Sequence, residues 1–407
     1  MSFINQRTAL LIRYAFIASL ILSTTKVLFS QKNAAAITYK NGLKITIPDS
    51  SNQIKTKIIF NGRIHYDVSF IHQSEQLSEV LGSAHNGQEF RRIFIANTGS
   101  LFYGNLNYKV QLNFSGGKIG FRDIYIEPKL FQTKSLEAYL RAGQFKDPFR
   151  FENLLSSNNL SIIERSYLQS FAPLRNTGLM YHMNALNNRF AFQLAYLGNT
   201  DDTANEISDT DGFNITTRAT YLITAKKENT IHVGISYSLR NRGKDGTYTF
   251  KVKPPVHLMP NYISVSLNNL DDVQLFNVET AWIRQRLMVM AEMITAKMSP
   301  SIDKNYYSFY GQVSYFLNRN SYHEYNNSLL GIKDIIGKKG AIEIAGRYSL
   351  ANFGADVAGK STMVQDFTLG GNFYFNEQFR LMLDYTVANL NTIGTSSGLN
   401  LRMQLTF

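Results

Sequence analysis

The chain ends in the sequence Gly398-Leu399-Asn400-Leu401-Arg402-Met403-Gln404-Leu405-Thr406-Phe407. Every second residue back from the terminal phenylalanine is apolar, and the residues between them are polar. Because successive side chains of a strand point to opposite faces, this alternation predicts a strand with one apolar and one polar face. A strand of this kind with an aromatic residue at its end is typical of the closing strand of an outer-membrane β-barrel. The alternative is an edge strand of a soluble β-sandwich.

The opposite end of the chain has the features of a secretory signal peptide. Arg7 and Arg13 precede an apolar stretch at 14–22, and small and polar residues follow around Ser30. The stretch is shorter than the roughly 20 residues that a helix needs to span a bilayer, so we expect cleavage rather than anchoring. The predicted organisation is a signal peptide over 1–30, a periplasmic lead-in over 31–55 and a transmembrane β-barrel over 56–407.

The composition narrows the class of protein. None of the 407 residues is cysteine, which excludes disulfides, thiolate metal ligands and a thiol nucleophile. No stretch beyond the first thirty residues is long and apolar enough for a transmembrane helix. Hydrophobic residues make up 44% of the chain, so a membrane protein of this composition must build its lipid-facing surface by alternation.

Segments of period 2 recur through the rest of the chain. The clearest lie at 64–70, 106–114, 190–196, 213–223, 231–239, 307–317, 342–350, 367–375 and 379–387. Less regular ones lie near 90–98, 119–127, 136–144, 177–183, 273–283 and 285–296. With the terminal strand they predict an all-β antiparallel transmembrane barrel of about sixteen strands, each about ten residues long. Parity places the long connection at 318–340 on the periplasmic side, so it is either a special turn or a slip in the strand count.

A second long connection follows the segment that ends near 144. It runs to about residue 176 and carries Lys146, Arg150, Glu164, Arg165 and Arg175. A connection of roughly 30 residues within a compact fold is usually functional. In a wide barrel it can fold inward and narrow the lumen. The alternative is an external flap that its own salt bridges stabilise.

Short motifs in this connection and elsewhere resemble one known family. They read GQFKDPF at 143–149, SSNNLSIIER at 156–165, APLRNTG at 172–178, EFRR at 89–92, FRDIYI at 121–126, GAIEIAGRYS at 340–349 and RMQLTF at 402–407. In this order they resemble the phosphate-selective porin O/P family over about residues 57–407. The resemblance implies a sixteen-stranded barrel in the outer membrane of a Gram-negative bacterium, usually a homotrimer, with a basic eyelet that passes anions.

The resemblance also implies a set of anion-pathway residues: Arg91, Arg92, Lys109, Lys146, Arg150 and Arg165, with Asp123 as an acid that weakens anion binding. Arg347 is added to this set because alternation places it on a polar face. Arginine binds phosphate oxygens with a planar fork and keeps its charge, and rings of Arg and Lys in a pore favour anions. Arg91 and Arg92 are adjacent, so only one can face the lumen unless a bulge or a loop turns both inward.

Four arginines lie on polar faces by alternation alone and have two interpretations. They form either a basic track along the lumen or ordinary wall cations paired with acids. They are Arg218, Arg240, Arg347 and Arg402. Arg175 is likewise either a pore residue or part of a salt bridge that fixes the inward loop.

The predicted function is a passive channel that prefers small anions such as phosphate or pyrophosphate. A non-selective general porin and a non-conducting structural or adhesive barrel remain alternatives. We expect no enzymatic activity and no cofactor, because no nucleophile motif appears and the seven histidines lack metal-ligand spacing. The expected partners are small anions, outer-membrane lipid, further copies of the chain and the barrel-assembly machinery, which would read Phe407. No nucleic-acid partner is expected.

Overall fold

The computed structural model describes residues 35–39, 42–198, 211–226, 228–244, 246–302, 304–326, 332–336, 340–357 and 360–407. The predicted signal peptide lies outside the described residues, and the predicted lead-in is described in part. Within the described ranges, no helix has the length and apolar character needed to cross a membrane.

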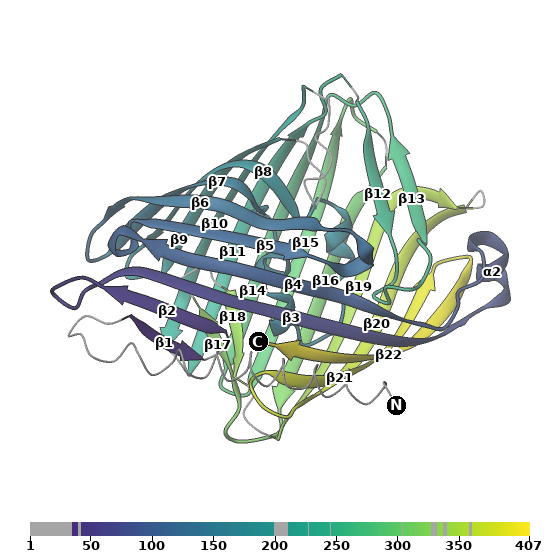
Figure 1. Ribbon diagram of the computed structural model, residues 1–407. Helices are drawn as coiled ribbons and strands as arrows, with labels where there is room; N and C mark the ends of the chain where they lie inside the picture. Colours follow the sequence, from purple (N-terminus) through teal and green to yellow (C-terminus); the bar gives the residue numbers. More distant parts are fainter. Residues whose placement is uncertain are drawn as a thin grey trace, which may run out of the picture.

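Sixteen antiparallel strands close into a barrel (Figure 1), which confirms the predicted fold class. The barrel strands are β3 Ile54–Gln73, β4 Gly87–Leu101, β5 Leu106–Asn113, β6 Gly120–Gln132, β7 Leu136–Lys146, β8 Arg175–Ala185, β9 Phe190–Gly198, β10 Phe213–Lys226, β11 Asn229–Asn241, β14 Asp272–Arg284, β15 Leu287–Ser299, β16 Tyr306–Phe316, β19 Ala341–Val357, β20 Lys360–Tyr374, β21 Phe379–Leu390 and β22 Gly394–Thr406. The last strand pairs with the first, from Arg63↔Thr406 to Gln73↔Ser396. Closure leaves no free sheet edge in the bilayer, where an unpaired backbone would be costly.

The closing strand shows how alternation builds the two surfaces. Leu401 and Leu405 of β22 face outward and are 37% and 40% exposed, whereas Arg402 between them is buried in the lumen. Several strands exceed the expected length of about ten residues. The longest is β3, with 20 residues, because its first part continues beyond the barrel seam and pairs with β2 Leu43–Pro48.

Smaller elements occupy the connections. The hairpin of β1 Ala36–Tyr39 and β2 lies beside the start of β3, and α2 Glu75–Leu81 joins β3 to β4. Two 3-10 helices, η2 Phe102–Gly104 and η3 Ser115–Gly117, form the next two turns. Hairpin β12 Tyr248–Val252 and β13 Ile263–Leu267 lies at the opposite end of the barrel from the C-terminus (Figure 1).

The connection at 318–340 is a special turn, and the strand count does not slip there. It contains the hairpin of β17 Tyr322–Asn326 and β18 Ile332–Ile336. The backbone N–H of His323 donates to the carbonyl oxygen of Gln285 at 3.0 Å, in the turn between β14 and β15. This hairpin therefore folds back against the end of the barrel at which the C-terminus lies.

Candidate functional site

The connection between β7 and β8, residues 147–174, folds into the barrel lumen and packs against its wall. It contains α3 Phe151–Leu154 and two 3-10 helices, η4 Ser157–Asn159 and η5 Tyr167–Ser170. Its apolar side chains form one buried cluster with inward-facing residues of β14, β15 and β16 and with β12 and β13. Examples from the loop are Phe149, Phe151, Leu168 and Phe171, none more than 1% exposed. The apolar face of the loop thus packs on a wall that is apolar on its inner side.

Carboxylates of the barrel wall hold the loop from this side. Glu292 of β15 accepts hydrogen bonds from the backbone N–H groups of Phe151 and Glu152, both at 2.7 Å. Asp384 of β21 accepts one from the N–H of Ile163 at 2.6 Å, and Glu343 of β19 accepts one from the Ser161 hydroxyl at 2.6 Å. A hydrogen bond within a protein contributes about 0.5–1.5 kcal/mol net, so these four contacts together hold the loop firmly.

Two of the predicted anion-pathway residues also hold the loop. The buried Arg150 guanidinium donates to the carbonyl oxygens of Leu168 and Ala172, within the loop itself. Arg347 of β19 donates to the carbonyl oxygen of Glu164 at 2.7 Å and lies 3.4 Å from a Glu152 oxygen. Neither side chain lines the cavity described next, because both are covered by the loop that they bind.

A basic cavity of about 480 Å³ remains between the loop and the wall formed by β3 to β8. Seven arginines and two lysines line it: Arg63, Arg91, Arg92, Arg122, Arg141, Arg165, Arg175, Lys109 and Lys146. Among the described residues of the lining, Asp123 supplies the single carboxylate. Six of the eight predicted residues are therefore brought together here, namely Arg91, Arg92, Lys109, Asp123, Lys146 and Arg165. We call this cavity the basic passage.

Two β-bulges bring neighbouring charged residues into the passage together. The register of β3 and β4 steps from His65↔Arg92 to Tyr66↔Phe90, which leaves Arg91 as the extra residue. A bulge of this kind re-aims side chains that would otherwise point to opposite faces. It resolves how adjacent Arg91 and Arg92 can both face the lumen.

The second bulge lies between β5 and β6. There the register steps from Val110↔Ile124 to Leu112↔Phe121, so that Arg122 and Asp123 share one position of the partner strand. Both side chains line the passage.

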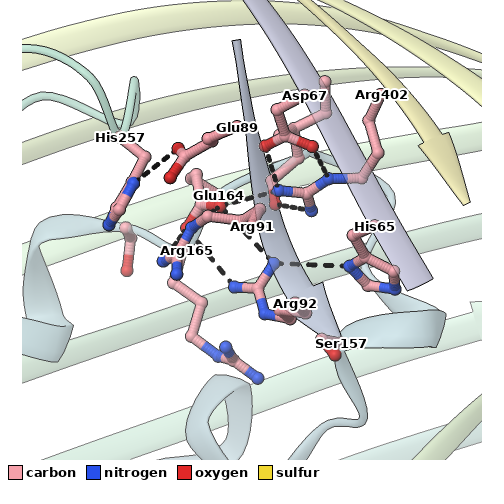
Figure 2. A network of polar contacts seen from close by, with 12 residues as sticks. His65, Asp67, Glu89, Arg91, Arg92, Ser157, Glu164, Arg165, His257 and Arg402 are labelled. Atoms are coloured by element: carbon pink, nitrogen blue, oxygen red, sulfur yellow. Dashed lines mark hydrogen bonds and ion pairs between the residues drawn. The ribbon is translucent and has the colours of Figure 1, made fainter. Parts of the chain in front are cut away.

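Glu164 on the loop is the centre of a network of arginines (Figure 2). It lies 2.9 Å from Arg91, 3.5 Å from Arg92 and 2.8 Å from Arg402. Burial alone would raise the pKa of the Glu164 carboxyl, but the three guanidinium groups outweigh it and hold the pKa well below its ordinary value. Arg402 also forms a two-pronged ion pair with Asp67, at 2.7 and 2.6 Å. Glu164 thus neutralises part of the charge at this side of the passage.

Other cations of the passage differ in whether an acid opposes them. Asp123 pairs with Arg175 at 2.7 Å and with Lys109 at 2.5 Å. In contrast, Lys146 donates to three loop carbonyl oxygens, those of residues 153 to 155, at 2.7–3.1 Å.

Two arginines resemble Lys146 in having neutral partners. Arg63 donates to the hydroxyls of Ser156 and Ser157 at 3.2 and 2.8 Å, and Arg165 donates to the carbonyl oxygens of Glu152 and Leu155. In the part of the chain that the structure describes, no carboxylate lies within ion-pair distance of Arg63, Lys146 or Arg165. These three cations leave the passage with net positive charge.

The four arginines that alternation places on the lumen wall, Arg218, Arg240, Arg347 and Arg402, are paired with acids. They do not form a track of unpaired cations. Arg218 binds Glu279, with Nε 3.0 Å from Oε1, and Arg240 lies 2.5 Å from Asp147. Arg347 and Arg402 bind acids and carbonyl oxygens of the loop, as described above. Arg175 does form a salt bridge, with Asp123, and it also lines the passage.

Sequence reasoning did not place Arg63, Arg122 and Arg141 in the anion pathway. Arg63 has a signal in the sequence, because it occupies the polar face of the first alternating segment. Arg122 has none, because it enters the passage through a bulge. Across the residues with described side chains, no cluster of three or more His, Asp or Glu could hold a metal ion.

Comparisons with known proteins agree with this architecture. A sequence profile described as phosphate-selective porin O and P matches residues 58–407. No curated protein sequence gives a significant match.

Several solved structures share the fold. An anion-selective porin from Comamonas acidovorans matches with a TM-score of 0.55 and 12% identity, covering 86% of this chain and 100% of that one. OmpF of Salmonella typhi in complex with daunomycin matches with a TM-score of 0.56 and 12% identity, covering 91% and 100%. The trimer form of OmpT, an outer-membrane protein of Vibrio cholerae, matches with a TM-score of 0.53 and 12% identity, covering 86% and 99%. At these identities the likeness concerns the fold alone.

Proposed function

The chain belongs to the phosphate-selective porin O and P family, and we propose that it forms a passive channel of the outer membrane that prefers small anions such as phosphate or pyrophosphate. The fold and the family are those of porins, and the anion preference is the proposed part. The observation that carries it is the lining of the basic passage, where seven arginines and two lysines face one carboxylate.

The charges that line the passage attract an anion as it moves through. A unit charge about 5 Å from a bound anion attracts it by about 3 kcal/mol at an effective dielectric constant of about 20. Arg63, Lys146 and Arg165 contact hydroxyl and carbonyl oxygens, so their charges are available to a passing anion. Glu164 opposes Arg91 and Arg92, and Asp123 opposes Lys109 and Arg175, which keeps binding weak enough for release. The passage therefore concentrates anions without trapping them.

The position of the loop supports this function. Its apolar face and its carboxylate contacts attach it to β15, β19 and β21, as described above, so the lumen that remains is bordered by basic residues of β3 to β8. A narrow passage with low-dielectric walls focuses the field of those residues. The residues that we propose for the anion pathway are Arg63, Arg91, Arg92, Lys109, Lys146 and Arg165, with Asp123 as the opposing acid.

We also propose the cellular setting. The outward apolar faces of the strands suit the lipid of the outer membrane of a Gram-negative bacterium, and residues 1–30 would direct export. The functional unit would be a homotrimer, as in the trimer form reported for the Vibrio cholerae protein. The barrel-assembly machinery would bind the terminal strand through Phe407. The channel would act without cofactor or chemical turnover.

Recording from single channels in planar bilayers tests the proposal. The purified trimer, placed in a potassium chloride gradient, should give conductance steps with a reversal potential of the sign for anion preference. Added phosphate should block the chloride current. Lys146→Gln should weaken both effects, whereas Lys297→Gln, on the outward face of β15, should change neither. Conductance steps with little ion preference would identify a general porin, and a folded barrel that gives no steps would identify a structural one.

A further inference from the structure

An aromatic ring lies between two arginines of the basic passage. Phe94 of β4 faces inward, is 6% exposed and lines the passage. The guanidinium carbon of Arg63 lies 5.4 Å from the centre of its ring, and that of Arg122 lies 5.3 Å from it. Arg63 is the direct cross-strand partner of Phe94, whereas Arg122 reaches the ring from the bulge of β6. Two cations from different strands thus share one ring.

An aromatic ring can hold a guanidinium in place without neutralising its charge, which a carboxylate cannot do. Elsewhere in the lumen, acids hold several of the buried arginines, as Glu279 holds Arg218 and Asp147 holds Arg240. An acid orients a guanidinium well but cancels its charge. The face of an aromatic ring attracts a cation through its quadrupole, and it leaves the net charge unchanged.

The remaining contacts of Arg63 are also neutral. Its Nη1 donates to the hydroxyls of Ser156 and Ser157 on the loop. Between the ring on one side and the hydroxyls on the other, the guanidinium bridges the wall and the loop without an opposing carboxylate. Tyr125 offers a partial parallel, because its ring lies 4.2 Å from the guanidinium of Arg141. That arginine, however, also pairs with Glu127.

We infer that Phe94 is a positioning residue of the anion pathway, whose ring contacts Arg63 and Arg122 and holds Arg63 in place while that guanidinium keeps its charge available to phosphate. The inference rests on the proposed anion channel and identifies a residue that determines its affinity. This role distinguishes the ion preference of the channel from its affinity for phosphate. Total charge sets the preference for chloride over potassium, whereas the placement of the guanidinium groups sets the affinity for phosphate.

The test compares these two properties in Phe94→Leu and Phe94→Tyr. One measurement is the phosphate concentration that halves the chloride current. The other is the chloride-to-potassium permeability ratio from reversal potentials. Phe94→Leu should raise the half-blocking concentration about threefold to tenfold, because the ring contact is lost. Its permeability ratio should stay within about twofold of the wild type, because no charge is removed. Phe94→Tyr keeps the ring and should leave both values close to those of the wild type.

Phe316→Leu is the matched control. Phe316 of β16 is a fully buried lumen residue that packs against Tyr374 and His323 and does not line the passage. This substitution should leave both measurements unchanged. If Phe94→Leu lowers the yield of folded trimer, Phe94→Met makes the same comparison with an unbranched side chain.

The possible results separate the inference from the proposed function. A folded Phe94→Leu channel with wild-type phosphate block overturns the inference alone. So does a loss of block that Phe316→Leu shares, or one accompanied by an equal loss of chloride preference, because each identifies a packing effect. A wild-type channel with neither anion preference nor phosphate block overturns the proposed function, and the inference with it.

Discussion

Replacement of Glu164 by glutamine should tighten phosphate binding. The carboxylate lies 2.9 Å from Arg91, 3.5 Å from Arg92 and 2.8 Å from Arg402, so it occupies a place that an anion would otherwise take. Glutamine has nearly the same shape and removes the negative charge. The backbone of this part of the loop keeps its contacts, because Arg347 binds the carbonyl oxygen of residue 164 and Asp384 binds the N–H of Ile163.

The magnitude follows from the distances in the network. An anion bound on the far side of Arg91 would lie about 7 Å from the Glu164 carboxylate. At an effective dielectric constant of about 20, removing a unit charge at that distance favours the anion by about 2 kcal/mol. Salt in the lumen and looser arginines reduce this by about half. About 1 kcal/mol remains, which corresponds to about a fivefold lower half-blocking phosphate concentration.

The assay is the titration of chloride current with phosphate, on folded trimer in planar bilayers. Glu343→Gln is the matched control, because Glu343 also holds the loop, through Ser161, but its other hydrogen bonds are to Asn372 and Tyr374 and not to arginines of the passage. It should lower the thermal stability of the barrel without changing phosphate block. Unchanged or weaker block in a folded Glu164→Gln channel would refute the reasoning.

Three further outcomes follow from the same contacts. Arginines hold the pKa of Glu164 well below its ordinary value. The stabilisation that the Glu164 charge contributes is therefore fully present above the unfolded pKa of about 4.3. It is lost only as the pH falls through the lower folded pKa. The chloride-to-potassium permeability ratio should therefore stay constant from about pH 8 to about pH 5, and a change centred near pH 5 would contradict this assignment. Arg63→Gln should raise the half-blocking phosphate concentration about tenfold and Arg91→Gln only about threefold. The difference is expected because Arg63 contacts hydroxyls, whereas Glu164 neutralises Arg91. Equal effects of the two substitutions in the same titration would argue against this difference. Phe407→Asp should lower the heat-modifiable folded fraction severalfold while Phe407→Tyr preserves it, because the ring of Phe407 packs over Gly62 at the barrel seam and a charged side chain there would lose this contact and face lipid. Wild-type levels of the aspartate variant on gel electrophoresis would count against the idea.

The strands of this protein could be predicted from the sequence because their physical cause is local. A strand between lipid and lumen needs apolar and polar side chains in turn, and residues 399–407 display that requirement without reference to any other segment. The same rule points Lys109 of β5 and Arg402 of β22 into the lumen. The number of strands and their closure followed from counting such segments.

The lining of the basic passage could be predicted only in part from the sequence. Lys146 and Arg165 lie within motifs that resemble a known family, and both line the passage. Arg150 was predicted from the same resemblance and Arg347 from alternation, but both side chains hold the loop in the structure. A charged side chain has the same sequence pattern whether it faces a channel or a loop carbonyl.

What only the tertiary structure decided is where the lumen remains open and which charges there remain unopposed. The bulge at Arg91 depends on how β4 pairs with β3, and the loop's attachment depends on Glu292 and Asp384, more than a hundred residues further along the chain. Alternation of apolar and polar residues is a property of neighbouring residues, so it can be recognised in the sequence. The net charge of a passage is a sum over contacts between distant segments, so it exists only once the barrel has closed and the loop has packed inside it.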